Sequence, residues 1–258
     1  MYPIDLSGQH ALVMGVANHR SLSWAIAQHL HRAGAALCLT YPNDRMKGLV
    51  EKTSAELTGA MLLECDVTKD ETIDAVAKHL GAKWGAIEML VHGIAFAAKE
   101  DLEGDFVKTS RAGYQLTLDV SAYSLLNVTN RMLPLLEKDG ASIVTLSYLA
   151  AERAVPSYNV MGTAKAALEQ SVRQLAFELG PKGIRVNAIS AGPVSTLAAR
   201  GIHGFTDMLN AHAEKAPLKR NVTQEEVGAA GLFLLSPMSS GITGEIMYVD
   251  AGYNIVGA

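Results

Sequence analysis

Residues 10–27 read HALVMGVANHRSLSWAIA and contain the junction that decides the fold. A short apolar run ends at Gly15, a polar turn follows, and a helical pattern with small residues at Ala25 and Ala27 comes next. A glycine at a strand-to-helix turn lets the backbone approach a pyrophosphate, and the helix N-terminus favours its negative charge. Only one glycine of the usual G-x-G-x-x-G is present, so a glycine that merely turns the chain is the alternative.

The same alternation of short apolar runs and amphipathic stretches continues to the end of the chain. The runs that predict strands are residues 10–15, 35–40, 60–65, 88–93, 142–147, 185–190 and 245–250. The stretches that predict helices are residues 23–33, 70–84, 122–137, 164–179 and 224–236. Apolar strands separated by helices indicate a parallel sheet covered on both faces. We therefore predict an α/β protein with a Rossmann-type doubly wound parallel sheet of about seven strands, forming a single domain over residues 1–258.

Composition excludes several classes of protein. The 258 residues are 49% hydrophobic and 19% charged, which is typical of a compact domain. A net charge of −4 gives no basic surface for nucleic acid. Cys38 and Cys65 stand in apolar runs without a Cys or His partner at ligand spacing, so we expect neither a disulfide framework nor a metal site. No signal peptide or membrane-spanning run is recognisable, which makes the cytoplasm the expected location.

Small or polar residues close several predicted strands at the edge where a doubly wound sheet binds ligands. Asp66 and Val67 follow the third strand, and a carboxylate or backbone group there could meet an adenine amine. Residues 93–95 and 191–194 close the fourth and sixth strands with glycine and other small residues, which suits a nucleotide sugar and a nicotinamide carboxamide. Together with the junction at Gly15, these features indicate one dinucleotide lying across the sheet.

The residues after the second strand bear on the choice of cofactor. No Arg or Lys follows that strand immediately, so nothing obvious awaits a 2′-phosphate and we expect NADH. Arg45 and Lys47 keep NADPH as an alternative.

Tyr158 and Lys165 lie seven residues apart in a segment that predicts one helix. Seven residues make almost two turns, so both side chains leave the same face about 10 Å apart along the axis. A phenol and an ammonium on one face can support charge on a substrate oxygen and hold a cofactor hydroxyl. A pair of solvated side chains is the alternative.

These residues resemble the short-chain dehydrogenase/reductase superfamily and, within it, the divergent bacterial enoyl-[acyl-carrier-protein] reductases. The glycine motif of that group, G-x5-S-x5-A, is matched by Gly15, Ser21 and Ala27. Its Y-x6-K motif is matched by Tyr158 and Lys165, and its second tyrosine, ten residues upstream, by Tyr148. The resemblance spans essentially the whole chain.

The resemblance implies roles for particular residues. The catalytic residues would be Tyr158, Lys165 and Tyr148, and Ala97 would line the substrate. Contacts to NAD would come from Gly15, Ser21, Leu22, Asp66, Val67, Ile94, Lys165, Val194, Ser195, Thr196, Leu197 and Ala198. The chain departs from the family pattern with Pro42 in place of a Gln, Gly93 in place of a Ser and Ala251 in place of a Gly.

The activity that the resemblance implies is the reduction of trans-2-enoyl-[acyl-carrier-protein] thioesters by NADH, the last reductive step of bacterial fatty-acid elongation. It also implies acyl carrier protein as partner and a homotetramer. Residues 193–223 have no strand pattern and would form a substrate-binding lid, although such an apolar stripe also suits ordinary core. A carbonyl or alcohol oxidoreductase of the same superfamily and a non-catalytic NAD(H)-binding regulator remain as alternatives.

Overall fold

A parallel seven-stranded sheet forms the centre of the computed structural model, which describes residues 4–137, 140–196 and 204–257. The strands are β1 (His10–Met14), β2 (Ala36–Tyr41), β3 (Met61–Glu64), β4 (Met89–His92), β5 (Ala141–Ser147), β6 (Ile184–Ala191) and β7 (Ile246–Val249). Their order is β3-β2-β1-β4-β5-β6-β7, and every neighbouring pair is parallel. All seven predicted strands are confirmed, and the doubly wound fold with them.

Alternate residues of the central strands point to opposite faces of the sheet, and each face has its own core. In β1, Leu12 and Met14 pack into one cluster, whereas Ala11 and Val13 pack into the other. All four side chains are fully buried. This two-sided burial explains why the strand sequences are continuous apolar runs rather than alternating ones.

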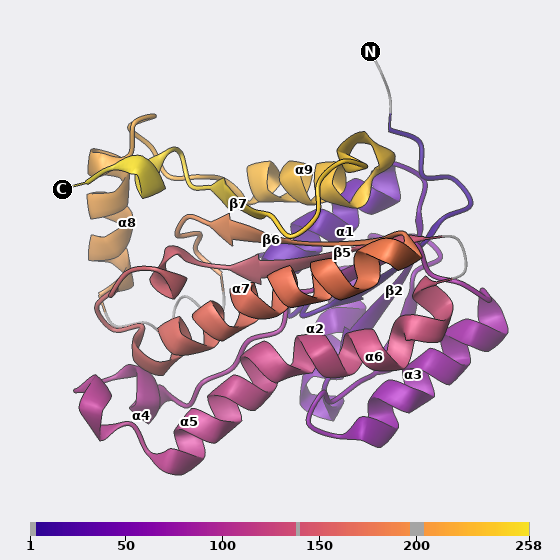
Figure 1. Cartoon of the computed structure of the whole chain (residues 1–258), viewed down its shortest axis with the longest axis horizontal. Helices are drawn as coiled ribbons and strands as arrows, with labels where there is room; N and C mark the ends of the chain where they lie inside the picture. The colour runs from indigo at the N-terminus through magenta and orange to yellow at the C-terminus, as the bar shows by residue number, and fades with distance from the viewer. Residues whose placement is uncertain (1–3, 138–139, 197–203, 258) are drawn as a thin grey trace.

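Helices cover both faces of the sheet (Figure 1). The first cluster is completed by α3 (Asp70–Lys83), α6 (Ser124–Leu136) and α7 (Asn159–Leu179). The second is completed by α1 (Leu22–Arg32), α2 (Asp44–Ser54) and α9 (Gln224–Leu235). The remaining helices are α4 (Lys99–Leu102), α5 (Arg111–Leu118) and α8 (Phe205–Lys215). Shorter helical turns are η1 (Phe106–Lys108), η3 (Leu149–Ala151), η4 (Gly180–Lys182), η6 (Pro237–Ser239) and η7 (Tyr253–Ile255).

Several helix predictions need correction. The sequence did not predict α2 or α5. Each of these helices buries only two or three residues, most of them small or polar, and so lacks a clear apolar stripe. The helix predicted over 122–137 is preceded by a π turn, η2 (Asp119–Tyr123), and continues α5. The helix predicted from residue 164 begins earlier, at Asn159, so Tyr158 is its N-cap and not one of its helical residues.

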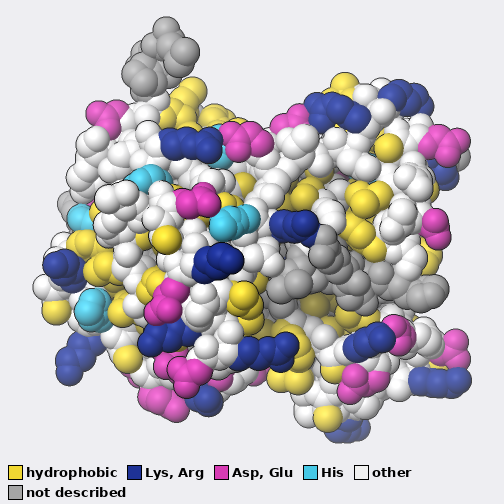
Figure 2. Space-filling view, turned by 180° about the vertical axis from the view of Figure 1, so that it is seen from behind, with side chains coloured by type: hydrophobic (Ala, Val, Ile, Leu, Met, Phe, Trp, Pro, Cys, Tyr) yellow, Lys and Arg dark blue, Asp and Glu magenta, His cyan; other side chains and the backbone are white. Residues whose placement is uncertain are grey.

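The described helices include none long and apolar enough to cross a membrane. On the face shown in Figure 2, Lys and Arg side chains are interspersed with Asp and Glu side chains, so neither sign of charge dominates there. This surface agrees with the small net charge of −4.

Candidate active site

The crevice at the carboxyl end of β1 is built from closely packed backbone. Gly15 has φ +86°, and a Cβ added to it would lie 2.0 Å from the carbonyl oxygen of Gly93, which follows β4. No L-residue with a side chain fits such a contact without moving one of the two strand ends. Packing alone therefore requires glycine at position 15, whether or not a ligand is bound.

The turn between β1 and α1 leaves the start of the helix open. The Ser21 hydroxyl accepts hydrogen bonds from the backbone N–H groups of Ala17 (2.9 Å) and Asn18 (3.2 Å), which fixes the turn. Ser21 is also the N-cap of α1, but no side chain caps the helix there. An uncapped helix N-terminus binds anions through its free N–H groups and its dipole. This local structure suits a pyrophosphate.

Ser23, in the first turn of α1, is a residue that sequence reasoning missed. A Cβ added to Gly93 would lie 1.9 Å from the Ser23 hydroxyl oxygen, so this oxygen occupies the space that a side chain at position 93 would need. A hydroxyl from α1 therefore fills the space beside the backbone at position 93. Within the described part of the chain, this buried hydroxyl has no hydrogen-bond partner.

The other predicted cofactor residues lie along the same edge of the sheet. Asp66 follows β3, but its carboxylate already accepts hydrogen bonds from the N–H (3.1 Å) and hydroxyl (2.7 Å) of Thr68 and pairs with Lys69 at 3.2 Å. An adenine there would compete with these contacts. Val67, Ile94, Leu22 and residues 194–196 also lie at or near the carboxyl edge, whereas Leu197 and Ala198 are outside the described residues.

The end of β2 carries a cation. The Lys47 ammonium lies 5.9 Å from the centre of the Tyr41 ring, the last residue of the strand. Asn43, after Pro42, caps α2 by accepting a hydrogen bond from the Met46 N–H. A positive charge is therefore present near the position where a cofactor's 2′-hydroxyl or 2′-phosphate is expected.

Tyr158 is presented by a strained backbone at the start of α7. Ser157 has φ +60° and Asn159 has φ +37°, so left-handed residues other than glycine flank the tyrosine on both sides. Such conformations cost about 1–3 kcal/mol each and cluster at functional sites. The ring centre of Tyr158 lies 4.9 Å from that of Tyr148, with the planes tilted by 55°. The two predicted tyrosines are thus brought together.

Both tyrosine hydroxyls are protonated at neutral pH. Burial raises the pKa of Tyr148 to about 12, and burial followed by the nearby Tyr148 raises the pKa of Tyr158 further. A neutral phenol donates a hydrogen bond, so both rings can stabilise a negatively charged oxygen.

Lys165 is buried in the second turn of α7, with 5% of its surface exposed. Its ammonium donates a hydrogen bond to the Leu146 carbonyl oxygen of β5 (2.7 Å). Burial lowers the pKa of Lys165 to about 8, an effect that the negative charge of Glu169, one turn later, opposes. The side chain is therefore charged at neutral pH, but close to its titration range.

The helix α8 lies beyond the carboxyl ends of the strands, beside the start of α7 (Figure 1). The Tyr148 hydroxyl contacts the Met208 sulfur of α8 at 3.4 Å. One turn later in α8, the buried His212 ring stacks on Tyr253 with centres 4.4 Å apart. The predicted covering segment thus touches the tyrosine pair through α8.

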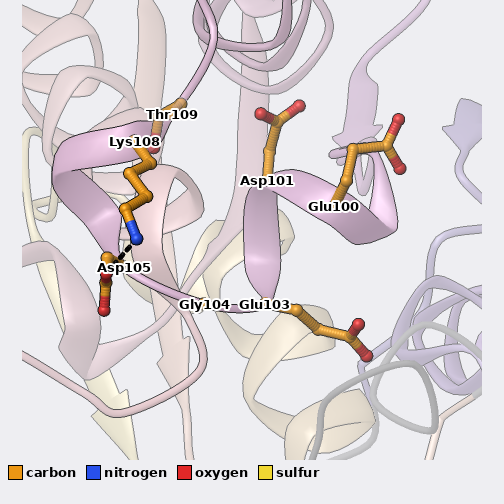
Figure 3. A pocket seen from close by; sticks show the side chains of 7 residues that line it. All are labelled: Glu100, Asp101, Glu103, Gly104, Asp105, Lys108 and Thr109. Carbon is orange, nitrogen blue, oxygen red and sulfur yellow. Dashed lines mark ion pairs between the residues drawn. The ribbon is translucent and has the colours of Figure 1, made fainter.

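An acidic pocket lies between α4 and η1 (Figure 3). Its cavity of about 290 Å³ is lined by Glu100, Asp101, Glu103, Gly104, Asp105, Lys108 and Thr109. The segment is joined to the start of α7 by the Asn159 amide, which donates a hydrogen bond to the Gly104 carbonyl oxygen (3.2 Å). Among the described residues, no group of three or more His, Cys, Asp or Glu side chains is placed to hold a metal ion.

A doubly wound parallel sheet with a glycine turn after its first strand, and with tyrosine and lysine side chains at its carboxyl edge, is typical of the class of proteins that bind dinucleotides. A model of the enoyl-(acyl carrier protein) reductase family matches residues 15–254. The chain therefore belongs to this family.

Named relatives agree with this assignment. Enoyl-[acyl-carrier-protein] reductases [NADH] of a Nostoc species and of Rhizobium meliloti are each 51% identical, over 98% of this chain and 99% and 92% of theirs. The crystal structure of the Aquifex aeolicus NADH enzyme is 44% identical, with a TM-score of 0.95 over 98% of this chain and 99% of that one. A Bacillus cereus enzyme solved with NADP+ and indole naphthyridinone is 47% identical, with a TM-score of 0.96 over 98% and 100%.

Proposed function

We propose that this protein reduces trans-2-enoyl-[acyl-carrier-protein] thioesters to saturated acyl thioesters with NADH, the last reductive step of the fatty-acid elongation cycle. The observation that carries the proposal is the position of Tyr158 beside Tyr148, at the N-cap of the helix that also buries Lys165. The relatives with NADH in their names support the choice of cofactor.

The residues present fit a bound dinucleotide. The open start of α1, the Gly15–Gly93 contact and the unpartnered Ser23 hydroxyl all lie at one end of the crevice. The Lys165 ammonium at the other end would hold ribose hydroxyls. When bound, NADH supplies the hydride for the β-carbon of the enoyl group.

The tyrosine stabilises the charge that the reaction places on the thioester oxygen. In a ketone, that oxygen is bonded to the carbon that receives hydride, but in an enoyl thioester it is three bonds away. A tyrosine seven residues before the lysine lies farther from it than a tyrosine four residues before it, so its hydroxyl can reach this more distant oxygen. Tyr158, kept neutral by its raised pKa, donates a hydrogen bond to this oxygen, and the Lys165 charge favours the anion. A proton from solvent then adds to the α-carbon, which gives the saturated thioester. Tyr148 forms a wall of the acyl site.

The covering segment excludes water from the reacting atoms. The contact between Met208 and Tyr148 supports a role for α8 as part of a lid over about residues 193–223, within a single domain that spans residues 1–258. Residues 197–203 of this segment are outside the described part of the chain.

Loss of NADH absorbance in the presence of crotonyl and longer trans-2-enoyl thioesters tests the proposal. We expect consumption of one NADH per double bond, with little consumption when simple ketones replace the thioesters. Consumption only with ketones would instead identify a carbonyl oxidoreductase. Binding of NADH without turnover of either substrate would identify a cofactor-binding regulator.

We further propose that the chain is a homotetramer that acts on acyl groups carried by acyl carrier protein. Support for self-association comes from large apolar side chains left exposed on neighbouring helices: Tyr114, Leu116, Tyr123, Leu126 and Phe177. Sedimentation at micromolar concentration would measure the oligomer directly, and a monomer would contradict this proposal.

We infer a cytoplasmic location for the enzyme. Cys38, inside β2, and Cys65, just after β3, are buried free thiols, and burial raises their pKa values to about 12 and about 11, which keeps them unreactive. Free cysteines of this kind are typical of a reducing compartment.

A further inference from the structure

A π turn interrupts the long helix that α5 and α6 would otherwise form. This turn, η2 (Asp119–Tyr123), contains one extra residue, and such turns often mark functional sites. An extra residue rotates everything that follows by about 100° about the helix axis, so it decides which side chains face the sheet. Here it accompanies two buried serines, Ser121 and Ser124, which are 0% and 1% exposed.

Ser121 binds both backbone polar groups of Phe96. Its hydroxyl accepts a hydrogen bond from the Phe96 N–H (2.9 Å) and donates one to the Phe96 carbonyl oxygen (3.0 Å). The strand β4 has already ended at His92, so this segment no longer has a ladder of strand neighbours. The Ser121 hydroxyl therefore satisfies the two backbone groups of Phe96 that a neighbouring strand would otherwise bind, and these two hydrogen bonds fix the position of the loop.

Ser124 binds the beginning of the same loop through His92. The imidazole contacts the hydroxyl oxygens of Ser124 (2.9 Å, through Nε2) and Thr145 (3.1 Å, through Nδ1). Burial, and then the charge of Lys165, lowers the pKa of His92 to about 3, so the ring is neutral and carries one N–H. The Ser124 hydroxyl donates its own proton to the Val120 carbonyl oxygen (2.7 Å) and the Thr145 hydroxyl donates to the His92 carbonyl oxygen (2.8 Å), so the ring donates its single N–H to one of these two hydroxyls.

The two serines thus hold residues 92–97 at two points. Ile94 lies between the two anchors, and Ala97 follows the second. The contact between Ser121 and Phe96 also closes the base of the excursion that contains α4 and α5, which lies below the start of α7 in Figure 1. The start of the loop is held independently of Ser121, since the Gly93 N–H donates a hydrogen bond to the Met14 carbonyl oxygen (3.2 Å). A shift of Phe96 would therefore move Ala97 and the wall of the proposed acyl site more than the end of β4.

We propose that Ser121 is a positioning residue, which acts through Phe96 to place Ala97 and the adjoining excursion against the acyl substrate. This inference rests on the proposed function, because it assigns the loop to the enoyl substrate. The proposal predicts that loss of the Ser121 hydroxyl weakens substrate binding and leaves NADH binding unchanged. A general destabilisation of the fold would weaken both.

The test compares steady-state kinetics and NADH binding in the variants Ser121→Ala and Ser121→Cys. We expect KM for a trans-2-enoyl thioester to rise about tenfold in both, since each loses roughly one buried hydrogen-bonding group. The dissociation constant for NADH, measured by fluorescence, should stay within about twofold. The cysteine variant leaves no cavity at position 121, so it remains informative if the alanine variant does not fold.

Ser142→Ala is the matched control. Ser142 is also a buried serine, and its hydroxyl donates a hydrogen bond to the Leu234 carbonyl oxygen (2.8 Å), but it lies at the amino end of β5, away from the crevice, so its loss should lower the melting temperature and leave KM unchanged. Amide hydrogen exchange at Phe96 is a readout that needs no activity: it should quicken in the Ser121 variants but not in the control. An unchanged KM, or equal losses of substrate and NADH affinity, would overturn the proposal. Wild-type protein that does not reduce enoyl thioesters would refute the proposed function, while the exchange result would still decide whether Ser121 fixes Phe96.

Discussion

The two ends of the crevice are built in different ways. Where β1 and β4 end, the site is made of backbone, because Gly15 and Gly93 leave no room for side chains. Where β5 meets α7, it is made of side chains whose protonation is set by burial, as for Tyr158 and Lys165. The first end should therefore be sensitive to volume and the second to charge and hydrogen bonding.

The largest expected effect is at the backbone end. In Gly15→Ala, the new Cβ would lie 2.0 Å from a backbone carbonyl oxygen, so we expect a loss of roughly 4 kcal/mol in unfolding free energy, from overpacking and the left-handed backbone together. Gly59→Ala is the control: its φ of +82° is similar but its surroundings are open, and it should lose only about 1 kcal/mol. Chemical denaturation measures both, and equal losses would show that packing at Gly15 does not matter.

The side-chain end should respond to pH. Lys165 carries its charge below its pKa of about 8 and loses it above, so NADH affinity should be constant at lower pH and fall as the pH rises through this value. We expect affinity to be about tenfold weaker one to two pH units above the pKa. Titration of NADH fluorescence across this range measures it. Lys165→Ala should show no such step, and the same step in that variant would assign it to another group.

A smaller effect should follow from the neighbour of Lys165. The Glu169 charge opposes the lowering of the Lys165 pKa, so Glu169→Gln should move the NADH-affinity step to lower pH and weaken binding at pH 8 about threefold. Glu178→Gln changes an exposed carboxylate on the same helix and should leave the step in place. If the pH of the NADH-affinity step is unchanged in both variants, the Glu169 charge does not influence the pKa of Lys165.

The smallest effect separates the cost of a left-handed backbone from the cost of overpacking at Gly15. Ala251, which follows β7, has φ +58°. Glycine adopts this conformation without strain, so Ala251→Gly should raise the unfolding free energy by about 0.5–1 kcal/mol and the melting temperature by about 2 °C. Ala211→Gly, in the ordinary backbone of α8, should instead destabilise the protein by up to about 1 kcal/mol. A destabilised Ala251→Gly protein would mean that the alanine methyl group contributes packing.

Most of the fold could be predicted, because strands that are buried on both faces are continuous apolar runs, which can be recognised in the sequence. The seven strands are short apolar runs, and each observed strand lies within one residue of its predicted bounds. The helices α2 and α5 could not be predicted, because they bury few apolar residues. The π turn leaves no periodic signal at all, since its effect is to break the helical period.

The residues of the site likewise include some that the sequence could identify and others that it could not. Gly15, Tyr158 and Lys165 could be singled out because their spacing along the chain carries the information. Ser23 and Ser121 could not, because each matters through a residue distant in sequence, Gly93 for the first and Phe96 for the second. Only the folded chain shows that a hydroxyl from α1 fills the place of a side chain at position 93.

Separate measurement of NADH affinity and turnover in Tyr158→Phe and Lys165→Ala tests the central claim most directly. The account predicts that the tyrosine variant loses about a hundredfold or more in turnover of an enoyl thioester while its NADH affinity stays within about twofold. The lysine variant should lose turnover and bind NADH about tenfold more weakly as well. Unchanged NADH affinity without the lysine, or full turnover without the tyrosine hydroxyl, would contradict the division of work between these two residues.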